Sequence, residues 1–380
     1  MKTTYTKIYN LLTPSEHRGA LVLLALMIVG MLLETLGIGL IIPVITLMMQ
    51  GDLGVSYPVV ANLFKYLGQP SQTDLIVFVM LGLVGVYFVK NLFLAFLIWK
   101  QTHFVFDVQV KLSNRLFANY LRQPYTFHLQ RNSAELIRNV SSETVNLTIA
   151  ITSIQMLVAE LMVLIGIATL LLLVEPLGAL IVVVVLGTAA WGFHRITRKR
   201  ISHWGVERQF HDGLRIQHLQ QGLGGAKDVK LLGRESDFLA QFYIHNMKSA
   251  HVTKLQSNLQ NYPRLMFELL AASGLAILVI SMLSQGRDMT VIIPMLGLFA
   301  AAAFRLMPSV NRILSSIQSL RYYLPVVNTL YEEIMLASPE PVSKQRNGSE
   351  VFRKNLCISN LIYQYPGAIV PALNNISLSI

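Results

Sequence analysis

The chain has 380 residues, of which 53% are hydrophobic and only 13% are charged, and its mean hydropathy is +0.52. A soluble domain carries about 25% charged residues, so this composition excludes an ordinary soluble protein and predicts one that resides in a membrane. The formal net charge of +11 suits either nucleic-acid binding or the basic loops of a membrane protein, and its distribution along the chain favours the loops over nucleic acid.

Six apolar segments are each long enough to cross the hydrocarbon core of a bilayer, which needs about 20 residues. They lie at 20–49, 75–99, 145–174, 177–194, 265–284 and 291–312. The first segment is far too long for a cleavable secretory signal, so we expect it to remain as a membrane helix. The pattern predicts an all-α polytopic membrane protein with six long transmembrane helices.

The connections between these segments alternate in charge. Those after the first, third and fifth segments are short or nearly uncharged, with only Lys65 and Arg287 as cations. Those after the second and fourth segments, 100–140 and 194–254, are long and basic. Because Lys and Arg are retained on the cytoplasmic side, we expect both long loops and both chain termini to be cytoplasmic.

The long loops keep apolar residues at helical spacing, which predicts that the membrane helices extend into the cytoplasm by several turns. Near the loop tips, the segments 123–136 and 232–242 interrupt this spacing and resume it. We expect a short crossing helix in each segment, with bends at Pro124 and Gly233.

The chain changes character after the sixth segment. Residues 336–350 are polar and contain Pro, Gly and Ser, as a linker between domain 1–335 and a second unit would. Residues 351–380 then alternate in the manner of β-strands. About thirty residues are too few for an independent core, so we expect this second domain to be incomplete in the sequence.

Six spans, two long basic loops with crossing helices, and the ending NLIYQYPGAIVPALNNISLSI resemble a type I ATP-binding-cassette exporter of the half-transporter kind. The resemblance implies that 351–380 opens an α/β nucleotide-binding domain, in which Tyr365 stacks on adenine. It also implies ATP and Mg²⁺ as cofactors of the parent protein, and a dimer with a second copy of the chain. The phosphate loop GxxxxGK[ST] would follow Ile380, so this chain alone is not expected to hydrolyse ATP.

A narrower resemblance is to the lipid-linked oligosaccharide flippases of this superfamily. It is carried by ETLGIGLIIPVITLM at 34–48 and FRLMPSVNRILSS at 304–316. It implies transport across the bacterial cytoplasmic membrane and a short external helix at 52–68. The substrate-binding cations implied by this subgroup are Arg264, Arg305 and Arg312, together with Lys90 where the subgroup usually has arginine. Lysine keeps the charge there but loses the bidentate fork of a guanidinium.

The position of these cations can be judged from the spans alone. Lys90 and Arg305 each lie about 15 residues from the outer end of their span, whereas Arg264 and Arg312 are nearer the cytoplasmic edge. A buried cation is costly in a bilayer, and charge-assisted hydrogen bonds to a diphosphate would compensate it. These positions favour an anionic lipid-linked substrate that contacts all four side chains.

Structural explanations for the same cations remain open. Arg264 and Arg312 could extend to the membrane surface, and Arg264 could pair with Glu268 one turn away. Alternatively, Lys90 or Arg305 could pair with the carboxylates of the spans, Glu34 or Glu160. The cargo could also be another lipid, a hydrophobic drug or a peptide, or the chain could be a membrane fragment that transports nothing.

Other chemistry is not indicated. The glycine-rich stretch 221–230 contains Lys227 but lacks the spacing of a phosphate loop, so we interpret it as a bend. The loop histidines and the single cysteine, Cys357, occur without metal-type spacing, and no nucleophile elbow or triad is visible. We therefore predict no catalytic residue and no metal site.

Overall fold

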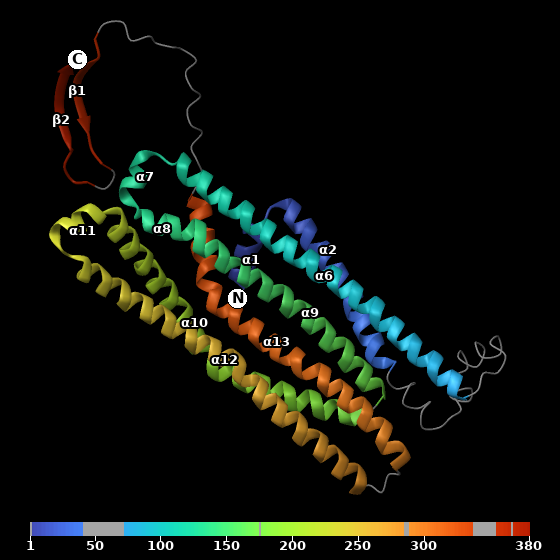
Figure 1. Cartoon of the computed structure of the whole chain (residues 1–380). Coiled ribbons are helices and arrows are strands. Elements are labelled where there is room, and N and C mark those ends of the chain that lie inside the picture. The colour runs from blue at the N-terminus through green and yellow to red at the C-terminus, as the bar shows by residue number, and fades with distance from the viewer. Residues whose placement is uncertain (1, 41–71, 175, 285–288, 337–354, 366–367) are drawn as a thin grey trace.

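The computed structural model describes residues 2–40, 72–174, 176–284, 289–336, 355–365 and 368–380. It is an elongated bundle of long helices followed by a pair of strands (Figure 1). Four helical stretches of the described residues are long and apolar enough to cross a membrane: Pro14–Gly39, Val77–Arg122, Ser133–Leu173 and Glu235–Ser281.

The long helices account for all six expected spans wherever the structure describes them. Their bounds are α2 Pro14–Gly39, α6 Gln72–Arg122, α9 Thr144–Val174, α10 Pro176–Gly224, α12 Glu235–Ser284 and α13 Met289–Leu336. Helices α6, α10, α12 and α13 have 48 to 51 residues, more than twice the length needed to span the hydrocarbon core. The predicted helical extensions are therefore confirmed, while residues 41–49 and the expected external helix at 52–68 lie outside the described residues.

Apolar clusters hold the bundle together at several levels. One cluster joins Leu11, Leu116, Leu147 and Leu330, so it links the N-terminal helix α1 (Lys2–Leu11) to α6, α9 and α13. Others join α2, α9 and α13, and α12 with α10 and α13. Helix α13 contributes to all of these clusters, and in Figure 1 it runs through the middle of the bundle.

The first loop tip bends where the sequence predicts, but it contains two short helices. Pro124 precedes α7 (Tyr125–Gln130), and Asn132 caps α8 (Ser133–Arg138) by accepting a hydrogen bond from the backbone of Ala134 at 3.0 Å. A π-helical turn, η1 (Asn139–Glu143), joins α8 to α9. The chain leaves the helical conformation again at Arg131 and Asn132, so the single crossing helix expected at 123–136 is divided into α7 and α8.

The second short helix lies upstream of its expected position. It is α11 (Ala226–Leu232), whereas residues 235–242 already belong to α12, so the assignment to 232–242 was wrong. Two consecutive glycines, Gly224 and Gly225, end α10 early, and Gly233 caps α11 in the left-handed conformation with φ 61°. Stretch 221–230 is thus a bend, as predicted. Helices α7 and α11 lie at the same end of the bundle, here called the α7–α11 end (Figure 1).

Two strands follow the bundle, as the alternating pattern predicts. Strand β1 (Cys357–Tyr363) pairs antiparallel with β2 (Leu373–Ser379), with Leu361 opposite Ile376. The register shifts on either side of this pair, and Asn360 and Asn375 adopt positive φ values near the shifts. Helix α13 ends at Leu336, and most of the expected linker lies outside the described residues.

Candidate functional site

Lys90 forms a buried ion pair between α2 and α6. Its Nζ lies 3.6 Å from Oε2 of Glu34, and each residue is only 7% exposed. The ring centroid of Tyr87 is 4.2 Å from the same Nζ, while the Tyr87 hydroxyl donates to the backbone oxygen of Gly37 at 3.3 Å. The aliphatic part of Lys90 packs against α2 beside Gly37, where a Cβ would lie 3.6 Å from Cδ of Lys90. The sequence left open whether Lys90 pairs with Glu34 or with Glu160, and the structure shows the pair with Glu34.

Arg312 pairs with the second buried carboxylate, between α9 and α13. Its Nε lies 2.6 Å from Oε1 of Glu160, which is 6% exposed. The Arg312 side chain keeps 40% of its area exposed. The contact with Glu160 uses Nε, and a guanidinium carries its further N–H donors on its two terminal nitrogens.

The two remaining cations differ in what the structure describes. Arg264 is exposed on α12, as is Glu268, and the ion pairs of the described residues do not join these two. Arg305 lies on α13, seven residues before Arg312, and its side chain is outside the described part of the chain. The described cations thus occupy separate places on α6, α12 and α13, and their contact with a substrate remains a prediction.

Sequence reasoning left open which of the span cations would pair with Glu160. The available signal was the carboxylate itself, because a charge in an apolar span requires compensation. Several cations lay at plausible depths, and only the packing of α9 against α13 selects Arg312.

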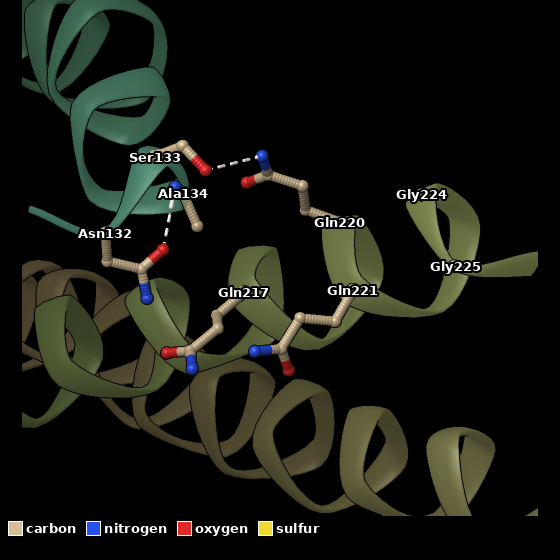
Figure 2. Close-up of a pocket in the computed structure, with 8 residues that line it drawn as sticks. All are labelled: Asn132, Ser133, Ala134, Gln217, Gln220, Gln221, Gly224 and Gly225. Carbon is tan, nitrogen blue, oxygen red and sulfur yellow. Dashed lines mark hydrogen bonds between the residues drawn. The ribbon is translucent and has the colours of Figure 1, made fainter. Parts of the chain in front are cut away.

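A hollow of about 280 Å³ lies at the α7–α11 end, between the start of α8 and the end of α10 (Figure 2). The residues that line it are uncharged: Asn132, Ser133, Ala134, Gln217, Gln220, Gln221, Gly224 and Gly225. The amide of Gln220 donates to the Ser133 hydroxyl at 2.9 Å. Such a lining offers hydrogen bonds but no charge, so it does not suit a phosphate group.

A buried polar network joins the first loop tip to the last turn of α13. Glu333 is 5% exposed and accepts from the Tyr120 hydroxyl and from Nη1 of Arg131, both at 2.9 Å. Asn139, fully buried in η1, donates to the Tyr120 oxygen at 3.3 Å. Helix α13 leads toward the strands, so this network connects the α7–α8 segment with the helix that precedes β1.

Histidines meet where α10 packs on α12. Nδ1 of His211 lies 3.0 Å from Nδ1 of His245, and His218 stacks on His245 with ring centroids 5.4 Å apart. Burial lowers the pKa of His211, Lys248 lowers it further, and Glu207 and Asp212 act in the opposite direction. The described residues contain no group of three potential ligands arranged to hold a metal ion.

Tyr365 follows β1 and is 45% exposed, with its ring edge-on to Tyr363 at a centroid distance of 5.0 Å. An exposed aromatic ring at a strand end fits the expected stacking on adenine. That role remains a prediction, and the part of an ATP site that would hold phosphates is not among these residues.

The family of the chain follows from its sequence once this architecture is known. Residues 20–304 match the ABC transporter transmembrane region. The chain belongs to this family. Its long helices therefore form a multi-pass transmembrane domain of the type I ABC exporter kind, as the first resemblance predicted.

A solved structure gives the same fold for the ABC transmembrane region described here. The structure of a bacterial Atm1-family ABC exporter with ATP bound superimposes with a TM-score of 0.67. The match covers 96% of this chain and 61% of the exporter chain, at 16% sequence identity. Identity this low shows a shared fold, and this chain spans about 61% of the length of the protein that it matches.

Proposed function

We propose that this ABC transmembrane region moves a lipid-linked oligosaccharide, or a similar anionic glycolipid, across the bacterial cytoplasmic membrane. The observation that carries the proposal is Arg312, whose side chain is 40% exposed while its buried Nε lies 2.6 Å from the buried carboxylate of Glu160. A diphosphate between a polyprenol and a sugar is the kind of group that the two terminal nitrogens would bind.

The proposed mechanism is alternating access in a dimer of two such chains, with both termini in the cytoplasm. ATP bound between the two nucleotide-binding domains would supply the energy for closure. The long helices act as rigid levers because their hydrogen-bonded backbones continue through 48 to 51 residues. In this proposal α7, α8 and α11 contact the nucleotide-binding domains, and Tyr365 holds adenine. The Glu333 network then transmits movement between α8 and α13.

The cations contribute unequally in this proposal. Arg312 and the exposed Arg264 lie toward the inner ends of their spans, so they would receive the headgroup as it enters. The charge of Lys90 is already balanced by Glu34. An anionic substrate would therefore stabilise Lys90 less than it would stabilise an unpaired cation. Arg305 is included in the proposal only because of its position in α13 and the resemblance to the flippase subgroup.

The balanced Lys90–Glu34 pair favours a second candidate, an exporter of a neutral hydrophobic cargo. In that case the two buried pairs would stabilise the bundle and no cation would contact the substrate.

Reconstituted transport by the full-length protein separates the two candidates. We expect R312Q and R264Q each to reduce transport of an undecaprenyl-diphosphate-linked glycan by about 10-fold or more, because each loses charge-assisted hydrogen bonds. Transport of a neutral lipophilic dye should be unchanged. The variant R312Q/E160Q avoids leaving Glu160 without its partner, and K254Q, an exposed cation on α12, serves as the matched control. Wild-type transport of the glycolipid by both arginine variants would refute the anionic-substrate proposal.

A further inference from the structure

One face of α10 changes along its length from apolar to cationic. Leu180, Val184 and Trp191 share this face at helical spacing and are 57%, 53% and 63% exposed. Arg195, Arg198 and Lys199 continue the same face, and all three are exposed. The face therefore passes from a hydrocarbon-compatible surface to a positively charged one within about two helical turns.

The opposite face of α10 carries the packing. Leu186, Ala189 and Phe193 lie against the cluster around Phe267 on α12, and Ile201 is fully buried. Because the buried and cationic faces lie on opposite sides of the helix, the three cations point away from the bundle of this chain.

Within the described residues, no ion pair compensates the charge of this face. Residues 176–206 contain no Asp or Glu, and none of the three cations takes part in an ion pair among the described residues. Farther along α10 the situation differs, because Arg208 lies 3.5 Å from Asp212. The uncompensated charge is thus confined to the stretch directly after the apolar face.

Tryptophan side chains mark where this stretch meets the membrane surface. The guanidinium of Arg195 lies 5.3 Å from the ring centroid of Trp191. Helix α6 has a similar arrangement, with Lys100 Nζ 5.3 Å from the ring of the half-exposed Trp99. Exposed tryptophans next to cations are typical of the interface between acyl chains and headgroups.

We propose that Arg195, Arg198 and Lys199 form a docking face for the headgroups of anionic phospholipids, with Trp191 at the boundary of the acyl chains. The face offers three positive charges beside an apolar surface that is continuous with the membrane span, which is the complement of an anionic lipid. Guanidinium groups match phosphate geometry, and juxtamembrane cations are attracted to anionic leaflets. These residues differ from the proposed substrate cations, so the inference does not depend on the cargo.

Lipid titration of the full-length protein in detergent tests this face. We expect phosphatidylglycerol to raise the melting temperature of the wild type, whereas phosphatidylcholine raises it much less. In R195Q/R198Q/K199Q the phosphatidylglycerol concentration needed for the same rise should increase by about fivefold per charge, or on the order of 100-fold in total. R195K/R198K, which keeps the charge but loses the guanidinium geometry, should need a much smaller increase than the triple glutamine variant.

A variant with the same change in net charge provides the control. K227Q/K248Q/K254Q removes three exposed cations from α11 and α12 and should respond to phosphatidylglycerol as the wild type does. An equal loss in both triple variants would overturn the proposal, because net charge alone would then explain the effect. Equal stabilisation by phosphatidylcholine would also overturn it. Stabilisation by inorganic phosphate at the same concentrations would assign the site to soluble anions rather than to lipid.

Discussion

Removing one member of the Lys90–Glu34 pair is expected to destabilise the bundle strongly, whereas removing both is not. The Nζ–Oε2 distance is 3.6 Å, and each side chain is 9% exposed. At an effective dielectric constant of about 20, this distance corresponds to an attraction of about 5 kcal/mol before desolvation is subtracted. Loss of one partner from a buried pair costs about 3–5 kcal/mol, because the remaining charge has no compensation.

The perturbation is therefore a double-mutant cycle of K90M, E34L and K90M/E34L. Each single variant should lose about 3–5 kcal/mol of unfolding free energy, while the double variant should lie within about 1 kcal/mol of the wild type. SDS-induced unfolding of the full-length protein, reconstituted in mixed micelles, measures these differences. D107N, which removes a charge at an exposed position on the same helix, is the control and should change stability by less than about 0.5 kcal/mol.

The same cycle assesses the function of Lys90. A double variant that is stable and still transports the anionic glycolipid would assign Lys90 to structure, whereas a stable variant that fails to transport it would assign Lys90 to the substrate. If the effects of the single variants simply add in the double variant, the two charges are not coupled. The electrostatic reasoning would then be refuted.

Two further predictions concern the contacts of α10. In G205A, the new Cβ would collide with the backbone carbonyl of Tyr322 on α13, and we expect a loss of about 1–3 kcal/mol in unfolding free energy. The folded structure holds the pKa of His211 below its unfolded value of 6.5, so the unfolded chain binds the proton first. We therefore expect the wild type to lose stability as the pH falls below about 6.5, and H211N to lose less of it over the same range.

Each of these predictions has a control on the same or a neighbouring helix. A Cβ at Gly192 on α10 would meet no atom within 4 Å, so G192A should lose no stability and should gain up to about 1 kcal/mol from helix propensity. Equal losses in G192A and G205A would exclude the collision as the cause. For the histidine, H251N alters an exposed residue of α12. Melting temperatures between pH 8 and pH 5 that decline in parallel for wild type, H211N and H251N would contradict the assigned role of His211.

Most of the architecture could be predicted from local features of the sequence. An apolar run such as 145–174 needs only its own length and composition to specify a membrane-length helix, because the backbone hydrogen bonds are satisfied within the segment. Pro124 and Gly233 bend the chain through their own backbone preferences. The alternation after residue 351 likewise indicated the strands β1 and β2.

Local features of the sequence were not sufficient to predict where helices begin and end when glycines or polar residues are compatible with several backbone conformations. The pair Gly224–Gly225 ended α10 earlier than expected and moved the second short helix to α11. Helix α1 was not anticipated, since it is stabilised by tertiary contacts such as the packing of Leu11 in a cluster with α6 and α13.

The two buried ion pairs show most clearly which features depend on the sequence alone and which depend on the tertiary structure. The sequence by itself determined that Glu34, Glu160 and the cations of the spans lie within apolar helices, where their charges need compensation. Only the tertiary structure decided that Lys90 meets Glu34 and that Arg312 meets Glu160. The reason is geometric: which side chains meet depends on the rotation and axial position of each helix against its neighbour. Contacts among many residues far apart in the sequence set those two quantities.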